Sequence, residues 1–178
     1  QLNDDVPEWQ DLVISTSSTP RDKWRKTRAF CWMAAFLHFD KIMQYPLIIA
    51  HEIAGIPYSQ IFEAFLEQAE TPDRYPLLST IARFFIDEAL HIQEGGPEYV
   101  YSEDWLGIYW PADEYIYIKL VADQSLDAFY EEAAQLLVGL IENTGSDERA
   151  KAITLQAVRA NKNLVSRPFV ADDIEIAL

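Results

Sequence analysis

Glu88 and His91 have the residue types and the spacing of a half-site for a pair of metal ions. Residues three apart project from one face of a helix, and carboxylate-bridged di-iron bundles use Glu-x-x-His in this way. Such a centre needs a second Glu-x-x-His, but neither His38 nor His51 has a glutamate three residues before it. The sequence therefore favours a structural role for Glu88 and His91, such as a surface ion pair, over a metal site.

His38 and Asp40 stand where a long apolar run gives way to polar residues. A histidine in this position is most simply a buried side chain held by hydrogen bonds. The functional alternative is a ligand contact at the mouth of a neighbouring active site, because perturbed polar groups gather at such sites. Cys31 lies within the same run, and no basic microenvironment that would activate its thiol is evident. We expect it to be a buried, unreactive core residue.

Residues 97–111 form the least regular stretch of the chain and are rich in tyrosine and tryptophan; Tyr109-Trp-Pro-Ala-Asp-Glu114 closes it. Aromatic side chains in such a stretch can form a wall against a substrate or another domain. They can equally fill the gap between helices, and the sequence leaves both readings open. No Ser-His-Asp or Cys-His arrangement has its partners here, and no glycine-rich phosphate loop is present. No catalytic residue is predicted.

The elements that must position these residues are helices. An apolar period of 3.6 residues recurs along most of the chain and predicts a single all-α domain of about six helices. Thr19 is the predicted N-cap of the first helix, with Pro20 as its first residue. Pro46 is expected to kink or break that helix, and Ser146 to cap the last one.

The composition is that of a folded, strongly acidic protein, which we divide into an N-terminal linker segment (1–20) and a helical domain (21–178). The net charge of −15 argues against nucleic acid and anionic membranes as partners. Basic residues gather at 21–28, the start of the first helix. A single cysteine excludes an internal disulfide and favours a reducing cytoplasm. The longest apolar run, 29–37, is far shorter than the about 20 residues that cross a membrane.

Three stretches in succession resemble one family of redox enzymes. They are Glu8-Trp-Gln-Asp-Leu-Val-Ile-Ser-Thr-Ser-Ser-Thr19, the helix from Trp24 to Asp40 with its Leu37-His-Phe39, and Tyr109-Trp-Pro-Ala-Asp-Glu114 followed by Phe129-Tyr-Glu-Glu132. In this order and spacing they look like the region that follows the radical S-adenosylmethionine (SAM) barrel in cobalamin (B12)-binding radical SAM enzymes. The resemblance covers most of the chain and rests on the succession of the motifs.

The resemblance implies a longer protein with a cobalamin-binding domain and a barrel whose Cys-x-x-x-Cys-x-x-Cys motif holds a [4Fe–4S] cluster that cleaves SAM. Many such enzymes transfer methyl groups by radical chemistry. A chain with one cysteine cannot hold that cluster, so we expect a C-terminal fragment that is inactive alone. Its implied role is to cap the radical SAM barrel of the same polypeptide, shape the pocket for a small-molecule or peptide substrate and exclude water.

The resemblance also implies candidates that face the substrate or the domain interface: Trp24, Arg28, His38, Tyr109 and Trp110. A domain uncovered by the loss of its barrel should expose an apolar or aromatic patch around Trp9, Trp24 and residues 99–111. The alternative is a free-standing helical module that binds a protein or a small molecule. Such a module should instead show a concave groove with a complete lining.

Overall fold

The computed structural model describes residues 11–168, and most of these residues are helical. The α-helices are α1 (Arg21–Ala34), α2 (Gln44–Ala54), α3 (Tyr58–Leu66), α4 (Pro76–Gln93), α5 (Ala112–Ala122), α6 (Leu126–Asn143) and α7 (Glu148–Leu164). A π-helix, η1 (Ala35–Phe39), continues α1, and a 3-10 helix, η2 (Glu67–Glu70), continues α3. The prediction of an all-α domain is confirmed, with seven α-helices in the described part of the chain.

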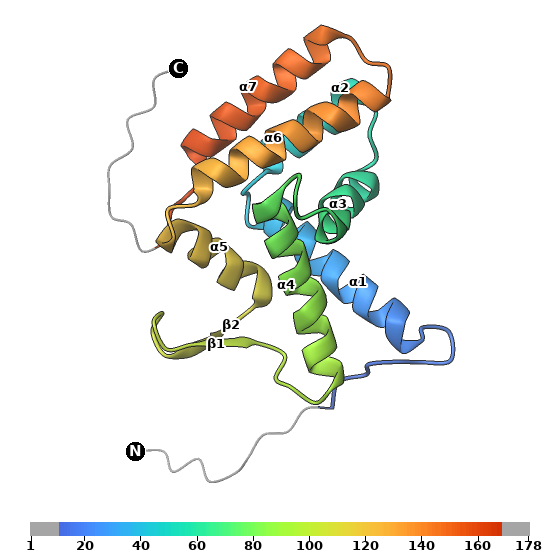
Figure 1. Ribbon diagram of the computed structural model, residues 1–178, viewed down its shortest axis with the longest axis vertical. Helices are drawn as coiled ribbons and strands as arrows, with labels where there is room; N and C mark the ends of the chain where they lie inside the picture. Colours follow the sequence, from blue (N-terminus) through green and yellow to red (C-terminus); the bar gives the residue numbers. More distant parts are fainter. Residues whose placement is uncertain (1–10, 169–178) are drawn as a thin grey trace.

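The helices form two groups that meet at a common core (Figure 1). In one group α1 and α4 pack along each other beside α5, and in the other α2 and α6 pack on α7. Phe36 of η1 lies where the groups meet and is fully buried. Its ring centroid is 6.1 Å from that of Phe85 in α4 and 5.5 Å from that of Phe129 in α6.

The buried face of α1 continues into η1 and follows the helical period, with Ala29, Trp32, Met33 and Phe36 all buried. Cys31 falls outside this stripe and is exposed, so the prediction of a buried core cysteine is wrong. The apolar run around it is longer than the face that the helix buries, because α4 and α3 cover only part of its circumference.

The ends of two helices differ from the prediction. α1 begins at Arg21 with Pro20 in the N-cap position and no side-chain cap, so Thr19 does not cap it. The cap of α7 is Asp147 and not Ser146: its carboxylate accepts a hydrogen bond from the backbone N–H of Ala150 at 2.9 Å. A carboxylate at a helix N-terminus also interacts favourably with the helix dipole.

The break after the first helix precedes the predicted one. The helical backbone ends with η1, and Lys41 takes a left-handed conformation with φ of 65°. Pro46 neither kinks nor ends a helix. It is buried in the first turn of α2, where a residue without an N–H loses no helical hydrogen bond.

The aromatic stretch 97–111 contains a short antiparallel hairpin, which is the one β-sheet within the described residues. Its strands are β1 (Val100–Ser102) and β2 (Ile108–Trp110), and Tyr101 lies opposite Tyr109. Strands of three residues are too short for their alternation to be recognised in the sequence. The hairpin lies beside the start of α5, at the end of the molecule away from α7 (Figure 1).

Between Asp11 and Pro168 the structure contains no helix that combines the length and the hydropathy needed to cross a membrane.

Candidate functional site

The five sequence-predicted site residues do not form one site. Trp24 and Arg28 lie on α1, His38 on η1, and Tyr109 and Trp110 on β2. At ~1.5 Å of rise per helical residue, Trp24 and His38 are about 20 Å apart along the helix axis. An exposed patch was also expected around Trp24 and Trp9, but Trp24 is half-buried and packs against the core, and Trp9 lies outside the described residues.

Arg28 links α1 to the segment that leads into β1. Its Nη2 lies 2.6 Å from Oε1 of Glu98, two residues before β1, and both side chains are about one-third exposed or less. The guanidinium also lies over the ring of Trp32, 4.6 Å from its centroid. Such a cation–π contact and a charge-assisted hydrogen bond together hold the hairpin against α1.

The hairpin places its aromatic side chains on two sides. On the inner side Trp110 donates a hydrogen bond from Nε1 to the carbonyl of Trp105 at 3.1 Å, and the Trp105 ring lies 5.1 Å from that of Tyr115 in α5. On the outer side the rings of Tyr101 and Tyr109 contact each other at 5.2 Å and are exposed. The reading in which these side chains fill the space between elements therefore holds for Trp105 and Trp110, whereas a wall against a substrate or another domain stays a prediction for the exposed Tyr101 and Tyr109.

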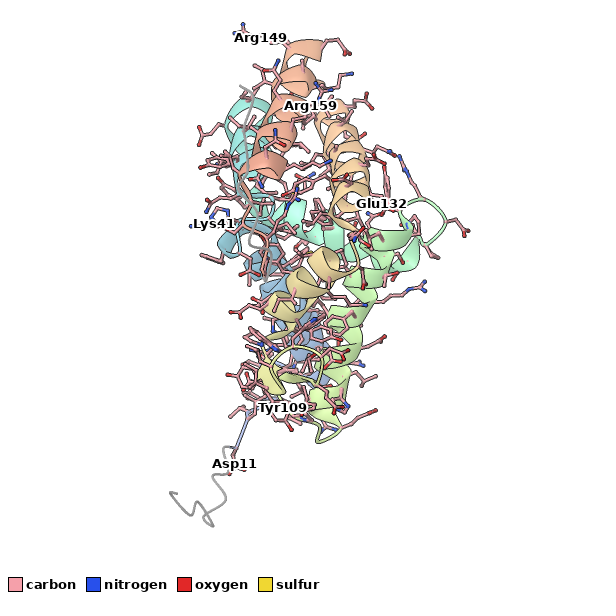
Figure 2. The ribbon with its side chains drawn as sticks, turned by 90° about the vertical axis from the view of Figure 1, so that its left-hand side faces the viewer. Asp11, Lys41, Tyr109, Glu132, Arg149 and Arg159 are labelled. Atoms are coloured by element: carbon pink, nitrogen blue, oxygen red, sulfur yellow. The ribbon has the colours of Figure 1, made fainter. Side chains whose placement is uncertain are left out.

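Exposed apolar side chains gather at this end of the molecule. We call them the hairpin patch; its members are Tyr99, Tyr101, Leu106, Ile108 and Tyr109. Leu106 is 71% exposed and Tyr109 58% exposed. Figure 2 shows Tyr109 at one end of the long axis and Arg149 at the other. Tyr101 and Tyr109 contact each other, so these two are not isolated exposed residues of the kind that ordinary surfaces carry.

A second group, which we call the η1–α5 cluster, consists of Arg28, Asp40, Asp113, Glu114 and Tyr117. Asp40 directly follows η1, whereas Asp113 and Glu114 lie in the first turn of α5. Tyr117 follows Asp113 by four residues, so the two side chains share one face of α5. Because η1 packs against α5, the turn after the π-helix brings Asp40 toward this face.

Burial, and secondarily the negative charges of Asp113 and Glu114, raises the pKa of Asp40 to about 7. Burial also raises the pKa of Asp113, although backbone N–H groups at the start of α5 and the Arg28 guanidinium oppose that shift. Oδ2 of Asp40 is buried and has no hydrogen-bond partner among the described residues. A carboxyl group in this state can accept or donate a proton near neutral pH.

Tyr117 links the cluster to the segment that follows α7. Its hydroxyl donates a hydrogen bond to the carbonyl of Ser166. Burial, and secondarily the charge of Asp40, raises the pKa of Tyr117 to about 12. The phenol therefore stays protonated at neutral pH. The cluster lies at a π-helix, a distortion that is frequent at functional sites.

His38 faces away from the cluster, toward α3. Its ring centroid is 5.9 Å from that of Tyr58, which in turn packs on His51 at 4.5 Å. Nδ1 of His38 is buried and has no hydrogen-bond partner among residues 11–168. The predicted hydrogen bond is therefore missing at Nδ1, and the ring packs instead against the rings of Phe39 and Tyr58.

Glu88 and His91 lie near the end of α4 without further ligands around them. Burial raises the pKa of Glu88, and the His91 ring occupies the space where a Cβ on Gly96 would lie. No group of three or more His, Cys, Asp or Glu within the described ranges is arranged to hold a metal ion. A [4Fe–4S] cluster does not fit this chain either, because its thiolate ligands are missing apart from Cys31.

The sequence alone does not indicate that the carboxylates of the η1–α5 cluster lie together. Asp40 and Asp113 are 73 positions apart by their numbers, so only the packing of α5 on η1 brings them near each other. The sequence offered two local signals: an aspartate near the end of an apolar run, and an Asp-x-x-x-Tyr spacing on a helix rich in apolar residues.

Comparison of the chain with protein-family models, with curated proteins and with solved structures gives no match. The fold and the two surface features described above therefore stand on the geometry of this chain alone, and the family resemblance stays a prediction.

Proposed function

We propose that this chain is a helical accessory domain that caps the radical SAM barrel of a cobalamin-dependent enzyme and forms one wall of its substrate pocket. The reaction of the whole enzyme would be of the methyl-transfer type, and the cytoplasm is the compartment that suits its lone cysteine. The chain supplies no cluster ligand and no catalytic residue, so its contribution is binding and the exclusion of water.

The observation that carries the proposal is the hairpin patch. A docking surface uncovered by the loss of its partner is expected to expose contiguous apolar side chains, and the resemblance predicted such a surface at residues 99–111. Leu12 and Val13 of the N-terminal linker segment are also exposed. Tyrosine is one of the residues that interfaces favour, since its ring buries a large area at little cost in entropy.

The η1–α5 cluster gives this surface a polar part. Arg28 belongs to the cluster and also pairs with Glu98, which directly precedes Tyr99 of the hairpin patch. A surface that combines apolar anchors with a few fixed polar groups is the usual form of a pocket wall. In the proposed enzyme, Asp40 and Asp113 would hydrogen-bond polar groups of the substrate.

The first test is to sequence the reading frame on both sides of this chain. We expect a Cys-x-x-x-Cys-x-x-Cys motif upstream, with a cobalamin-binding domain before it. The second test is association: the upstream part and this chain are produced separately and co-purified. Ile108→Glu, in the hairpin patch, should abolish co-purification because it buries a charge in an apolar interface.

Ile53→Glu is the matched control. Ile53 is 41% exposed, close to the 44% of Ile108, and it lines a cleft with Arg149 at the opposite end of the molecule (Figure 2). The control should co-purify like the unmodified chain. A reading frame that lacks the cysteine motif would refute the proposal and favour the free-standing binding module. Equal losses for the two variants would refute the hairpin patch as the docking surface.

A further inference from the structure

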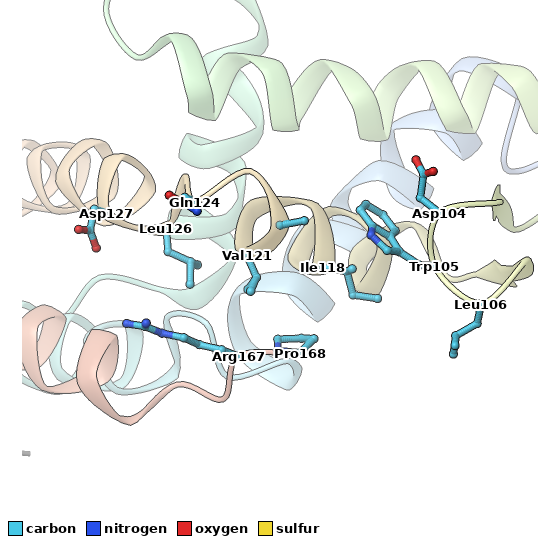
Figure 3. Close-up of a pocket in the computed structure, with 11 residues that line it drawn as sticks. Asp104, Trp105, Leu106, Ile118, Val121, Gln124, Leu126, Asp127, Arg167 and Pro168 are labelled. Atoms are coloured by element: carbon cyan, nitrogen blue, oxygen red, sulfur yellow. The ribbon is translucent and has the colours of Figure 1, made fainter. Parts of the chain in front are cut away.

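A groove of about 700 Å³ runs along the outer face of α5, between the hairpin turn and the C-terminal segment (Figure 3). Its apolar lining comes from four separate parts of the chain: Trp105, Leu106, Ile118, Val121, Leu126 and Pro168. The volume lies within the range of small-molecule sites, which is about 300–1,000 Å³. The groove is elongated along α5, with Trp105 and Leu106 at one end and Leu126 and Asp127 at the other.

Arg167 supplies a positive charge to one end of the groove. Its side chain extends along the wall toward Leu126 (Figure 3). No carboxylate of the described residues lies within salt-bridge distance of its guanidinium. Asp127 lines the same end, but its charge is matched by Lys162, whose Nζ lies 2.7 Å from Oδ1 of Asp127. Among the residues that line the groove, Arg167 is therefore the cation whose guanidinium has no ion-pair partner in the described part of the chain.

From this arrangement we propose that the groove binds a linear apolar molecule that ends in a carboxylate. The chain of the ligand would lie on Ile118 and Val121, with its far end against Trp105. Its carboxylate would accept hydrogen bonds from Arg167, since the planar guanidinium matches a carboxylate in geometry and charge. This inference does not depend on the proposed docking of the hairpin patch.

Three probes with the same hydrocarbon chain separate the contribution of the head-group charge from that of the apolar chain. They are dodecanoate, dodecyltrimethylammonium and 1-dodecanol, each titrated below its micelle concentration into the 178-residue protein. Isothermal titration calorimetry measures affinity, and the change in tryptophan fluorescence, to which Trp105 in the groove is expected to contribute most, reports occupancy. The net charge of −15 attracts the cation at long range, so a preference for dodecanoate must come from a local positive charge. We expect dodecanoate to bind most tightly.

Arg167→Gln should weaken dodecanoate binding about tenfold or more, the loss expected for a charge-assisted hydrogen bond, and leave 1-dodecanol unchanged. Arg159→Gln removes an exposed charge from α7, away from the groove, and should change neither (Figure 2). Trp105→Phe should remove the fluorescence change while the calorimetric binding persists. The inference is overturned if none of the probes binds, if dodecyltrimethylammonium binds as tightly as dodecanoate, or if Arg167→Gln and Arg159→Gln behave alike.

Discussion

The fold opposes the ionisation of Asp40. Its pKa is raised from 3.8 to about 7, first by burial and then by the charges of Asp113 and Glu114. A carboxyl group with a raised pKa contributes most stability below its unfolded pKa, and that contribution is lost as the pH rises through its folded pKa. The stability linked to Asp40 therefore decreases between about pH 4 and pH 7.

Asp40→Asn removes this dependence because an amide does not ionise. Near pH 4 the variant and the unmodified chain should have the same free energy of unfolding. Near pH 8 the variant should be more stable by about 1–2 kcal/mol, which is less than the full shift implies because solvent screens a partly exposed group. Urea unfolding at both pH values measures the difference. The exposed Asp73→Asn removes the same charge and should show no such trend; if the two variants agree, Asp40 is not the group responsible.

Glu132 of α6 caps the N-terminus of α4. Its Oε2 accepts hydrogen bonds from the backbone N–H groups of Leu77 at 3.0 Å and Leu78 at 2.9 Å. Glu132→Ala should lower the free energy of unfolding by about 1–2 kcal/mol, since it leaves two N–H groups unpaired and removes a favourable charge from a helix N-terminus. The adjacent, exposed Glu131→Ala is the control in α6 and should cost less than about 0.5 kcal/mol. Equal losses in thermal unfolding would contradict the capping role.

At the scale of elements, Asn161 of α7 fixes the turn between η1 and α2. Its Nδ2 donates to the carbonyls of Lys41 and Ile42, at 3.0 and 2.8 Å, and its Oδ1 accepts from the backbone N–H of Tyr45 at 3.1 Å. Asn161 is 1% exposed, so no solvent replaces these partners. These hydrogen bonds therefore hold the turn against α7.

Asn161→Ala should lower the free energy of unfolding by about 2–3 kcal/mol and speed amide exchange at Tyr45, because several buried groups lose their partners together. Hydrogen exchange read by mass spectrometry over the peptide that contains the turn measures the local effect. Asn163→Ala changes the same side chain on the exposed side of α7 and should leave the exchange of that peptide unchanged. Unchanged exchange in Asn161→Ala would show that the turn is held by other contacts.

The sequence predicts the helices better than the contacts between them. The apolar period identifies α4 and α6 because each helix repeats its buried face over several turns. It does not reveal that Glu132 caps α4, or that Asn161 holds a turn 120 positions away from it at Lys41. Those roles depend on how the helices pack, and the hairpin is too short to leave a periodic signal.

At the scale of the whole molecule, one aromatic cluster joins the two groups of helices and determines whether they unfold together. Phe36 is fully buried and contacts Phe85 of α4 and Phe129 of α6. The two groups should therefore unfold in a single cooperative transition, and the hairpin, which Arg28 ties to α1, should unfold with them. If the two groups of helices were separate domains, they would unfold in two separate transitions.

Phe36→Ala tests whether the two groups of helices unfold in one transition. Removing a buried ring at the junction should cost about 3–5 kcal/mol, and the loss should appear equally in two probes. Far-UV circular dichroism follows all the helices, whereas tryptophan fluorescence follows mainly the half that contains α1 and the hairpin. Phe39→Ala, on the same π-helix but 73% exposed, should cost less than about 1 kcal/mol. If the two probes give different midpoints for Phe36→Ala, the aromatic cluster does not couple the groups, and a partner that docks on the hairpin patch would stabilise only one of them.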